Sequence, residues 1–177
     1  MKKENDLLFS GNVYKIGDDI DTDGIIPAKY LNITDPRLLA QHCMEEIDPA
    51  FLKKIKEGDI LVAGKNFGCG SSREQAPLAL KGCGIACIIA PSFSRLFFRN
   101  AINVGLPIIE FSEAEVFAAG DRLKIDYIKG EIVHIKTGGR FETQQLPPFM
   151  QNLFKVGGLL PYIKERAIEK QRLNEKI

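Results

Sequence analysis

Short apolar runs alternate with segments of helical periodicity along the chain. The expected strands are 8–16, 60–64, 84–90 and 106–111, and the expected helices are 34–46, a short one beginning at 48–49 and ending before Gly58, 71–80 and 93–103. Such alternation favours a mainly parallel sheet with right-handed crossovers. We therefore predict an α/β fold with a central β-α-β-α-β region.

The last third of the chain follows a different pattern. Segments 122–127 and 131–136 alternate apolar and polar residues around Lys129-Gly130, which indicates a hairpin. A helix is expected from about Leu159. The length of 177 residues and the 45% hydrophobic content suit a single domain over 1–177, with a core of about 8–165 and a helical tail of about 159–177.

Charge and composition exclude several functional classes. There are 24 Lys and Arg against 23 Asp and Glu, so the basic bias of nucleic-acid binders is missing. No apolar run is long enough for a membrane span, and the start has no apolar signal region. We expect a cytoplasmic protein that binds small molecules and proteins, with its four cysteines as thiols.

The most informative stretch is the glycine-rich segment 64–76. Ser71 with Glu74 and Ser72 with Gln75 have the spacing of capping boxes, which predicts a helix start at these serines. A helix N-terminus beside Arg73 would bind a carboxylate. A purely structural interpretation, in which the serines cap and Arg73 is a solvated surface charge, explains the same residues.

Other candidate sites have weaker support. Gly68-x-Gly70 is followed by Arg73 where a dinucleotide fingerprint needs glycine. The acidic stretch 17–24 lacks the glycine and glutamate of a calcium loop, and His42 and His134 are too far apart in sequence to suggest a metal pair. The cysteine spacing does not suggest a cluster, and we predict no metal site on this chain.

Four segments together resemble a known family. Segment 66–76, Asn-Phe-Gly-Cys-Gly-Ser-Ser-Arg-Glu-Gln-Ala, resembles the signature of the mobile domain of the aconitase superfamily. Segments 21–31, 91–107 and 157–162 are similar to small subunits of 3-isopropylmalate dehydratase and homoaconitase. The resemblance implies a swivelling β/β/α layered domain with no cofactor of its own. Its partner would be a large subunit carrying a 4Fe-4S cluster, whose open iron acts on the departing hydroxyl.

The resemblance also implies roles for individual residues. Ser71 corresponds to the serine that removes a carbon-bound proton as an alkoxide, and Arg73 to the arginine that binds a substrate carboxylate. Asp23 matches an aspartate near the reacting centre, and Ser72 and Gly70 are expected in the substrate-binding turn. The implied function is a hydro-lyase subunit that interconverts 2- and 3-isopropylmalate in leucine biosynthesis. A homoaconitase or dimethylmalate-type subunit, and a non-catalytic metabolite-binding regulatory module, are the alternatives.

Substrate choice is expected to depend on the segment containing Leu31 and Asn32. Homoaconitase-like subunits tend to have an arginine after Tyr-Leu, whereas this chain has Asn32. Without that cation an alkyl substituent is favoured over an extra carboxylate, unless Lys29 or Arg37 supplies the charge.

Overall fold

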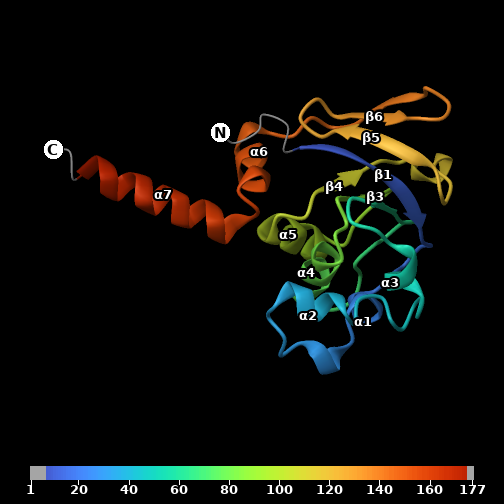
Figure 1. Cartoon of the computed structure of the whole chain (residues 1–177), viewed down its shortest axis with the longest axis horizontal. Helices are drawn as coiled ribbons and strands as arrows, with labels where there is room; N and C mark the ends of the chain where they lie inside the picture. The colour runs from blue at the N-terminus through green and yellow to red at the C-terminus, as the bar shows by residue number, and fades with distance from the viewer. Residues whose placement is uncertain (1–6, 175–177) are drawn as a thin grey trace.

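The computed structural model of the chain describes residues 7–174 (Figure 1). Its strands form one sheet in the order β4-β3-β2-β1-β5-β6-β7. They are β1 Leu8–Lys15, β2 Ile60–Val62, β3 Cys87–Ala90, β4 Ile108–Glu110, β5 Arg122–Asp126, β6 Glu131–His134 and β7 Arg140–Glu142. The helices are α1 Thr22–Ile25, α2 Pro36–Ala40, α3 Phe51–Lys54, α4 Gln75–Gly82, α5 Arg95–Val104, α6 Pro148–Lys155 and α7 Leu159–Asn174, with 3-10 turns at Ala28–Tyr30 and Ala114–Val116.

Strand β1 joins the two halves of the sheet. Its last three residues, 13–15, pair in parallel with β2, and β2, β3 and β4 continue the parallel arrangement. Its first five residues, 8–12, pair antiparallel with β5, which continues into β6 and β7. The predicted parallel β-α-β-α-β region and the hairpin around Lys129-Gly130 are therefore confirmed.

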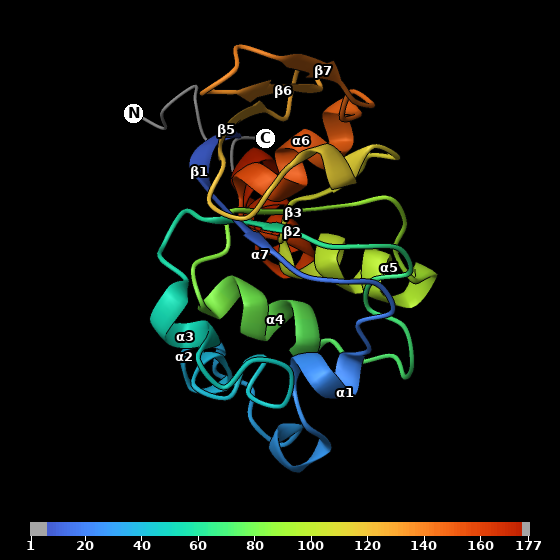
Figure 2. The same ribbon diagram turned by 90° about the vertical axis from the view of Figure 1, so that its right-hand side faces the viewer.

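Alternate residues of the parallel strands face two separate cores. Leu61 and Ile88 face the core that includes α2, α4 and α5. Ile60 and Ile89, their neighbours in sequence, face a second core formed with β5, β6 and α6. The resulting layers are helices, parallel strands and antiparallel strands, and they can be followed from bottom to top in Figure 2. No helix in the described part of the chain is long and apolar enough to cross a membrane.

The start of α4 differs from the sequence prediction. The helix begins at Gln75 rather than Ser71, its N-cap is Glu74, and no side chain caps it. Pro77 explains the late start, because a proline inside a helix clashes with the carbonyl four residues earlier, here that of Arg73. Both predicted capping boxes, at Ser71 and Ser72, are therefore wrong.

Other boundaries also differ. Helix α2 starts as predicted, with Asp35 as N-cap accepting from Arg37 N at 2.8 Å, but it ends at Ala40 instead of continuing to residue 46. The chain then turns so that Met44, with a φ of 61°, donates its N–H to Ile25 O at 2.9 Å. Strand β7 and helix α6 were not expected from the sequence. Helix α7 was expected, and it extends away from the layers (Figure 1).

Candidate active site

Three loops meet at the carboxyl ends of β1, β2 and β3. Gly68 N donates to Ile20 O at 2.7 Å and Thr22 N to Cys69 O at 2.9 Å, which joins the loop after β1 to the loop after β2. Phe67 N donates to Ser92 O at 3.1 Å and so adds the loop after β3. This end of a parallel sheet is where α/β proteins commonly bind ligands. The backbone contacts hold segment 66–73, called the serine–arginine turn below, against the acidic loop.

Two glycines shape the serine–arginine turn. Gly68 has a φ of 77°, and a Cβ there would lie 2.2 Å from Cγ of Phe97. Phe97 in turn packs edge-on against Phe67, with ring centroids 5.1 Å apart. Gly70 has a φ of 85°, a conformation that L side chains rarely adopt. Glycine at 68 therefore permits both the turn and the aromatic packing beneath it.

Ser71 is exposed at the top of this turn. Its carbonyl accepts from Oγ1 of the buried Thr22 at 2.9 Å, so its backbone is fixed from below. Its hydroxyl has no hydrogen-bond partner within the described residues, and it does not cap α4. The Ser71 hydroxyl is therefore held in place by its backbone while remaining available for chemistry.

The side chain of Arg73 packs against the segment after β1 rather than extending into solvent. One of its Nη1 hydrogens is donated to Asp23 Oδ1, and the same nitrogen is 3.2 Å from Ile26 O. The Arg73 side chain is only 12% exposed, whereas that of Asp23 is 54% exposed. This burial argues against a solvated surface charge. A guanidinium has five N–H donors, so donors remain for a substrate carboxylate.

Three residues to which the sequence reasoning gave no role in substrate binding support the site. They are Thr22, Asn100 and Gln75, and all lie within the motif segments or directly beside the turn. Asn100 on α5 donates from Nδ2 to Ser72 Oγ at 3.3 Å. Gln75 donates from Nε2 to Leu31 O at 3.0 Å. Each is a polar residue at a helix start or in a motif, but its partner is 28 to 49 residues away in sequence.

Leu31 and Asn32 lie in a loop beside the turn. Leu31 is half-buried and Asn32 is exposed. Lys29, one of the two cations considered above as substitutes for the missing arginine, pairs with Glu45 at 3.1 Å, and a hydrogen bond to Glu45 raises its pKa. Lys29 is thus engaged outside the turn, which strengthens the argument from Asn32.

Cys69 is not activated as a nucleophile. Its Sγ lies 3.5 Å from Asp19 O, and burial together with the charges of Asp21 and Asp19 raises the pKa of the thiol. Among the described residues no group of three or more His, Cys, Asp or Glu side chains is placed to hold a metal ion.

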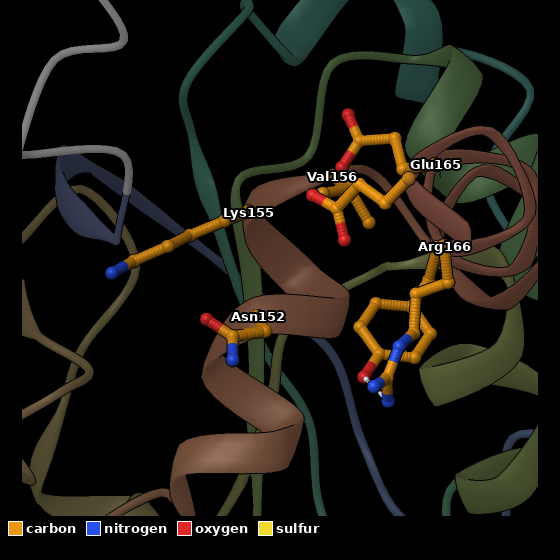
Figure 3. A pocket seen from close by; sticks show the side chains of 7 residues that line it. Asn152, Lys155, Val156, Glu165 and Arg166 are labelled. Atoms are coloured by element: carbon orange, nitrogen blue, oxygen red, sulfur yellow. Dashed lines mark hydrogen bonds between the residues drawn. The ribbon is translucent and has the colours of Figure 1, made fainter. Parts of the chain in front are cut away.

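A hollow near the C-terminal helices lies away from this site. A hollow of about 500 Å³ lies between α6 and α7 and is lined by Asn152, Lys155, Val156, Tyr162, Glu165, Arg166 and Glu169 (Figure 3). Arg166 donates to Tyr162 Oη at 3.1 Å on its wall. None of its lining residues belongs to the serine–arginine turn, in which Ser71 and Ser72 are exposed.

Residues 40–114, which include the serine–arginine turn, match the family described as Aconitase C-terminal domain. The chain is 54% identical over 159 residues to the 3-isopropylmalate dehydratase small subunit of Caldicellulosiruptor bescii, covering 89% of this chain and 96% of that protein. It is 53% identical over 165 residues to the isopropylmalate/citramalate isomerase small subunit of Methanocaldococcus jannaschii, covering 93% and 98%.

The crystal structure of 3-isopropylmalate dehydratase from Methanocaldococcus jannaschii superposes with a TM-score of 0.86 at 48% identity, over 93% of this chain and 98% of that one. The chain belongs to the family of 3-isopropylmalate dehydratase small subunits and is therefore a subunit of a hydro-lyase. The resemblance found in the sequence is confirmed.

Proposed function

We propose that this chain supplies the base and the carboxylate clamp with which an assembled enzyme interconverts 2- and 3-isopropylmalate in leucine biosynthesis. The observation that carries the proposal is the pairing of an exposed, fixed Ser71 with a largely buried Arg73 on one turn. Ser72 and Gly70 complete the substrate-binding turn, and Asp23 holds the Arg73 guanidinium in place.

The proposed chemistry follows from the acidity of the substrate. A hydrogen on a carbon beside a carboxylate is weakly acidic, so its removal needs a strong base and stabilisation of the growing negative charge. Ser71 Oγ takes this proton as an alkoxide, while Arg73 binds the carboxylate. Helix α4 begins four residues after Ser71, so its N-terminus does not start at the serine. We therefore assign stabilisation of the negative charge to the guanidinium of Arg73.

The site needs a second subunit to be complete. An open turn leaves the alkoxide exposed to water, which weakens electrostatic stabilisation. Departure of the hydroxyl is therefore assigned to the large-subunit partner, where the family resemblance places a 4Fe-4S cluster. The four thiols fit a reducing compartment, and we place the assembled enzyme in the cytoplasm.

Asn32 supports an alkyl-substituted malate as substrate. A third carboxylate brought to this loop, where Asn32 replaces an arginine and Lys29 is paired with Glu45, would keep its desolvation cost, whereas an alkyl group gains from burial. The relative named for both isopropylmalate and citramalate fits a pocket that accepts alkyl groups of different size. This favours isopropylmalate or a dimethylmalate-type substrate over homoaconitate.

Co-expression with a large subunit of the family, anaerobic purification and a dehydration assay test the proposal. We expect conversion of 3-isopropylmalate to the unsaturated diacid only when both subunits are present. Binding of the diacid by the isolated chain, with no dehydration by the complex, would instead support a metabolite-binding regulatory module. The presence of both Ser71 and Arg73 on one turn favours the enzyme.

A further inference from the structure

The loop that carries Leu31 and Asn32 is held by side chains that have no part in the proposed chemistry. This segment, residues 28–33, is called the variable loop below. It starts with the 3-10 turn Ala28–Tyr30, and its own backbone bonds are short-range: Leu31 N donates to Ala28 O at 3.2 Å and Ile33 N to Tyr30 O at 3.0 Å. Such a short turn does not fix its own position relative to the sheet, so its supports must come from elsewhere.

The first support is a stack of two rings. Tyr30 and His42 lie face to face, with ring centroids 3.7 Å apart and planes inclined by 12°. Nδ1 of His42 is 3.1 Å from Glu45 Oε2, and the other carboxylate oxygen of Glu45 is 3.1 Å from Lys29 Nζ. Lys29 Nζ also lies 4.8 Å from the Tyr30 ring centroid. Tyr30 and Lys29 of the variable loop are thus linked to His42 and Glu45 of the segment after α2.

That segment is itself anchored in the core. The side chains of Leu39, Cys43 and Met44, on either side of His42, are at most 1% exposed. Met44 N donates to Ile25 O at 2.9 Å, which ties the segment to α1. His42 is therefore held by a packed core, and its ring in turn fixes the ring of Tyr30 by stacking.

The second support comes from a residue two positions beyond the serine–arginine turn. Gln75, the first residue of α4, donates from Nε2 to Leu31 O at 3.0 Å. It follows Arg73 by two residues, and Arg73 itself contacts Ile26 O at 3.2 Å, just before the variable loop. The same short stretch that would bind the substrate carboxylate therefore also holds the backbone of the variable loop.

We propose that His42, through the ring of Tyr30, and Gln75, through the carbonyl of Leu31, are positioning residues that set the distance between the variable loop and Arg73 and thereby select the alkyl group of the substrate. This inference rests on the proposed function of Ser71 and Arg73. With the carboxylate fixed at Arg73, the alkyl group must fit the space that the variable loop leaves. Loosening either support changes that space without removing a group that touches the substrate.

The test compares two substrates on the assembled enzyme. Specificity constants for 3-isopropylmalate and citramalate are measured for wild type, Gln75→Leu, His42→Ala and His42→Phe, with Gln41→Ala as an exposed control beside His42. One methylene in an apolar pocket changes specificity by roughly 10- to 200-fold, so Gln75→Leu and His42→Ala should each change the ratio by at least about tenfold, mainly through KM for isopropylmalate. His42→Phe keeps the stacked ring and should keep most of the wild-type ratio, as should Gln41→Ala.

A merely structural role predicts a different result. It would lower both specificity constants by the same factor, or lower only the melting temperature, and either outcome with an unchanged ratio overturns the inference. If His42→Ala does not assemble, Gln75→Leu and Glu45→Ala decide the matter, because each removes polar contacts of the supports while leaving the stacked rings. If the wild-type complex dehydrates neither diacid, the proposed function itself fails, which is a distinct outcome.

Discussion

The surroundings of Arg73 distinguish it from a solvated surface charge. Its neighbours in sequence, Ser72 and Glu74, are exposed, yet its own side chain is 12% exposed and is held by Asp23 and Ile26 O. Ser71, two residues earlier, has the opposite character, with a fixed backbone and an exposed hydroxyl. A largely buried guanidinium beside an exposed hydroxyl suits the proposed binding of a carboxylate and removal of a nearby proton.

Ser71→Ala should leave folding and assembly intact while lowering turnover by roughly 10²- to 10⁴-fold, the usual contribution of a positioned base. The melting temperature should hardly change, because the Ser71 side chain neither caps α4 nor bonds to another described residue. Steady-state kinetics and thermal melting of the assembled enzyme measure both effects. Normal turnover in Ser71→Ala would remove Ser71 from the mechanism. Ser72→Ala, which loses the bond to Asn100, is the matched comparison and should affect KM more than kcat.

Asn32→Arg should shift the ratio of specificity constants from 3-isopropylmalate toward homoaconitate. A charge-assisted hydrogen bond to the extra carboxylate would change the free-energy difference given by that ratio by roughly 1 to 3 kcal/mol. Both substrates are compared in wild type and variant with the same large subunit. An unchanged ratio would exclude Asn32 from substrate choice, and a wild-type preference for homoaconitate would contradict the proposed substrate.

At the scale of elements, short helices depend on side chains outside them. Helix α3 has four residues and no side-chain cap at its N-cap residue Ala50. Asp48 supports it instead: one carboxylate oxygen accepts from Ala50 N at 2.9 Å, and the other from Tyr14 Oη at 2.5 Å and Lys54 Nζ at 2.7 Å. These bonds join the helix to β1 and to its own last turn.

Asp48 should therefore make stability depend on pH in acid. The hydrogen bond from Lys54, followed by those from Tyr14 and Ala50, lowers the pKa of Asp48 from 3.8 to about 2. Because the folded-state pKa is depressed, the carboxylate stabilises the fold fully above pH 3.8, and the contribution is lost as the pH falls through about 2. Asp48→Asn should be less stable than wild type at neutral pH and should lose less stability between about pH 4 and 2.

Urea unfolding at a series of pH values measures this difference. Glu46→Gln removes an exposed carboxylate nearby and should reproduce the wild-type pH dependence. A parallel pH dependence in wild type and Asp48→Asn would show that Asp48 does not support α3.

At the scale of the whole molecule, the sheet separates Cys87 from Cys43 and Cys83. Cys43 is buried in the core on the helical face, with Cys83 packed against that core, whereas Cys87 is buried in the core on the other face. Cys69 lies in the serine–arginine turn, with its thiol against Asp19 O. Cys87 is therefore separated from Cys43 and Cys83 by the sheet, and the length of α4 lies between Cys69 and Cys83.

The isolated chain should bind no iron-sulfur cluster when reconstituted anaerobically with iron and sulfide. Iron and sulfide analysis together with the visible absorption spectrum measure this, and the assembled enzyme serves as the positive control. A stoichiometric cluster on the isolated chain that is lost in Cys69→Ser or Cys83→Ser would contradict the assignment of the cluster to the partner.

The sequence by itself determined the strands of the parallel region, the hairpin, the C-terminal helix and the family. These features rest on local periodicity, on turn residues such as Lys129-Gly130, and on motifs that are contiguous in the chain. The site residues Ser71, Arg73 and Asp23 were also named from those motifs, although their roles remain proposals. Local patterns are enough for such features because each depends mainly on residues within a few positions of one another.

Only the tertiary structure decided where α4 begins, how β1 divides between two halves of the sheet, and what surrounds each site residue. A local capping pattern suggested Ser71 as a helix start, but the geometry around Gly70 and Pro77 places that start at Gln75. The partners of Arg73, Ser72 and Tyr30 lie between 12 and 50 residues away, so no local pattern reveals them. Burial of Arg73 and support of the variable loop arise from packing between distant segments, and such packing is a property of the folded chain alone.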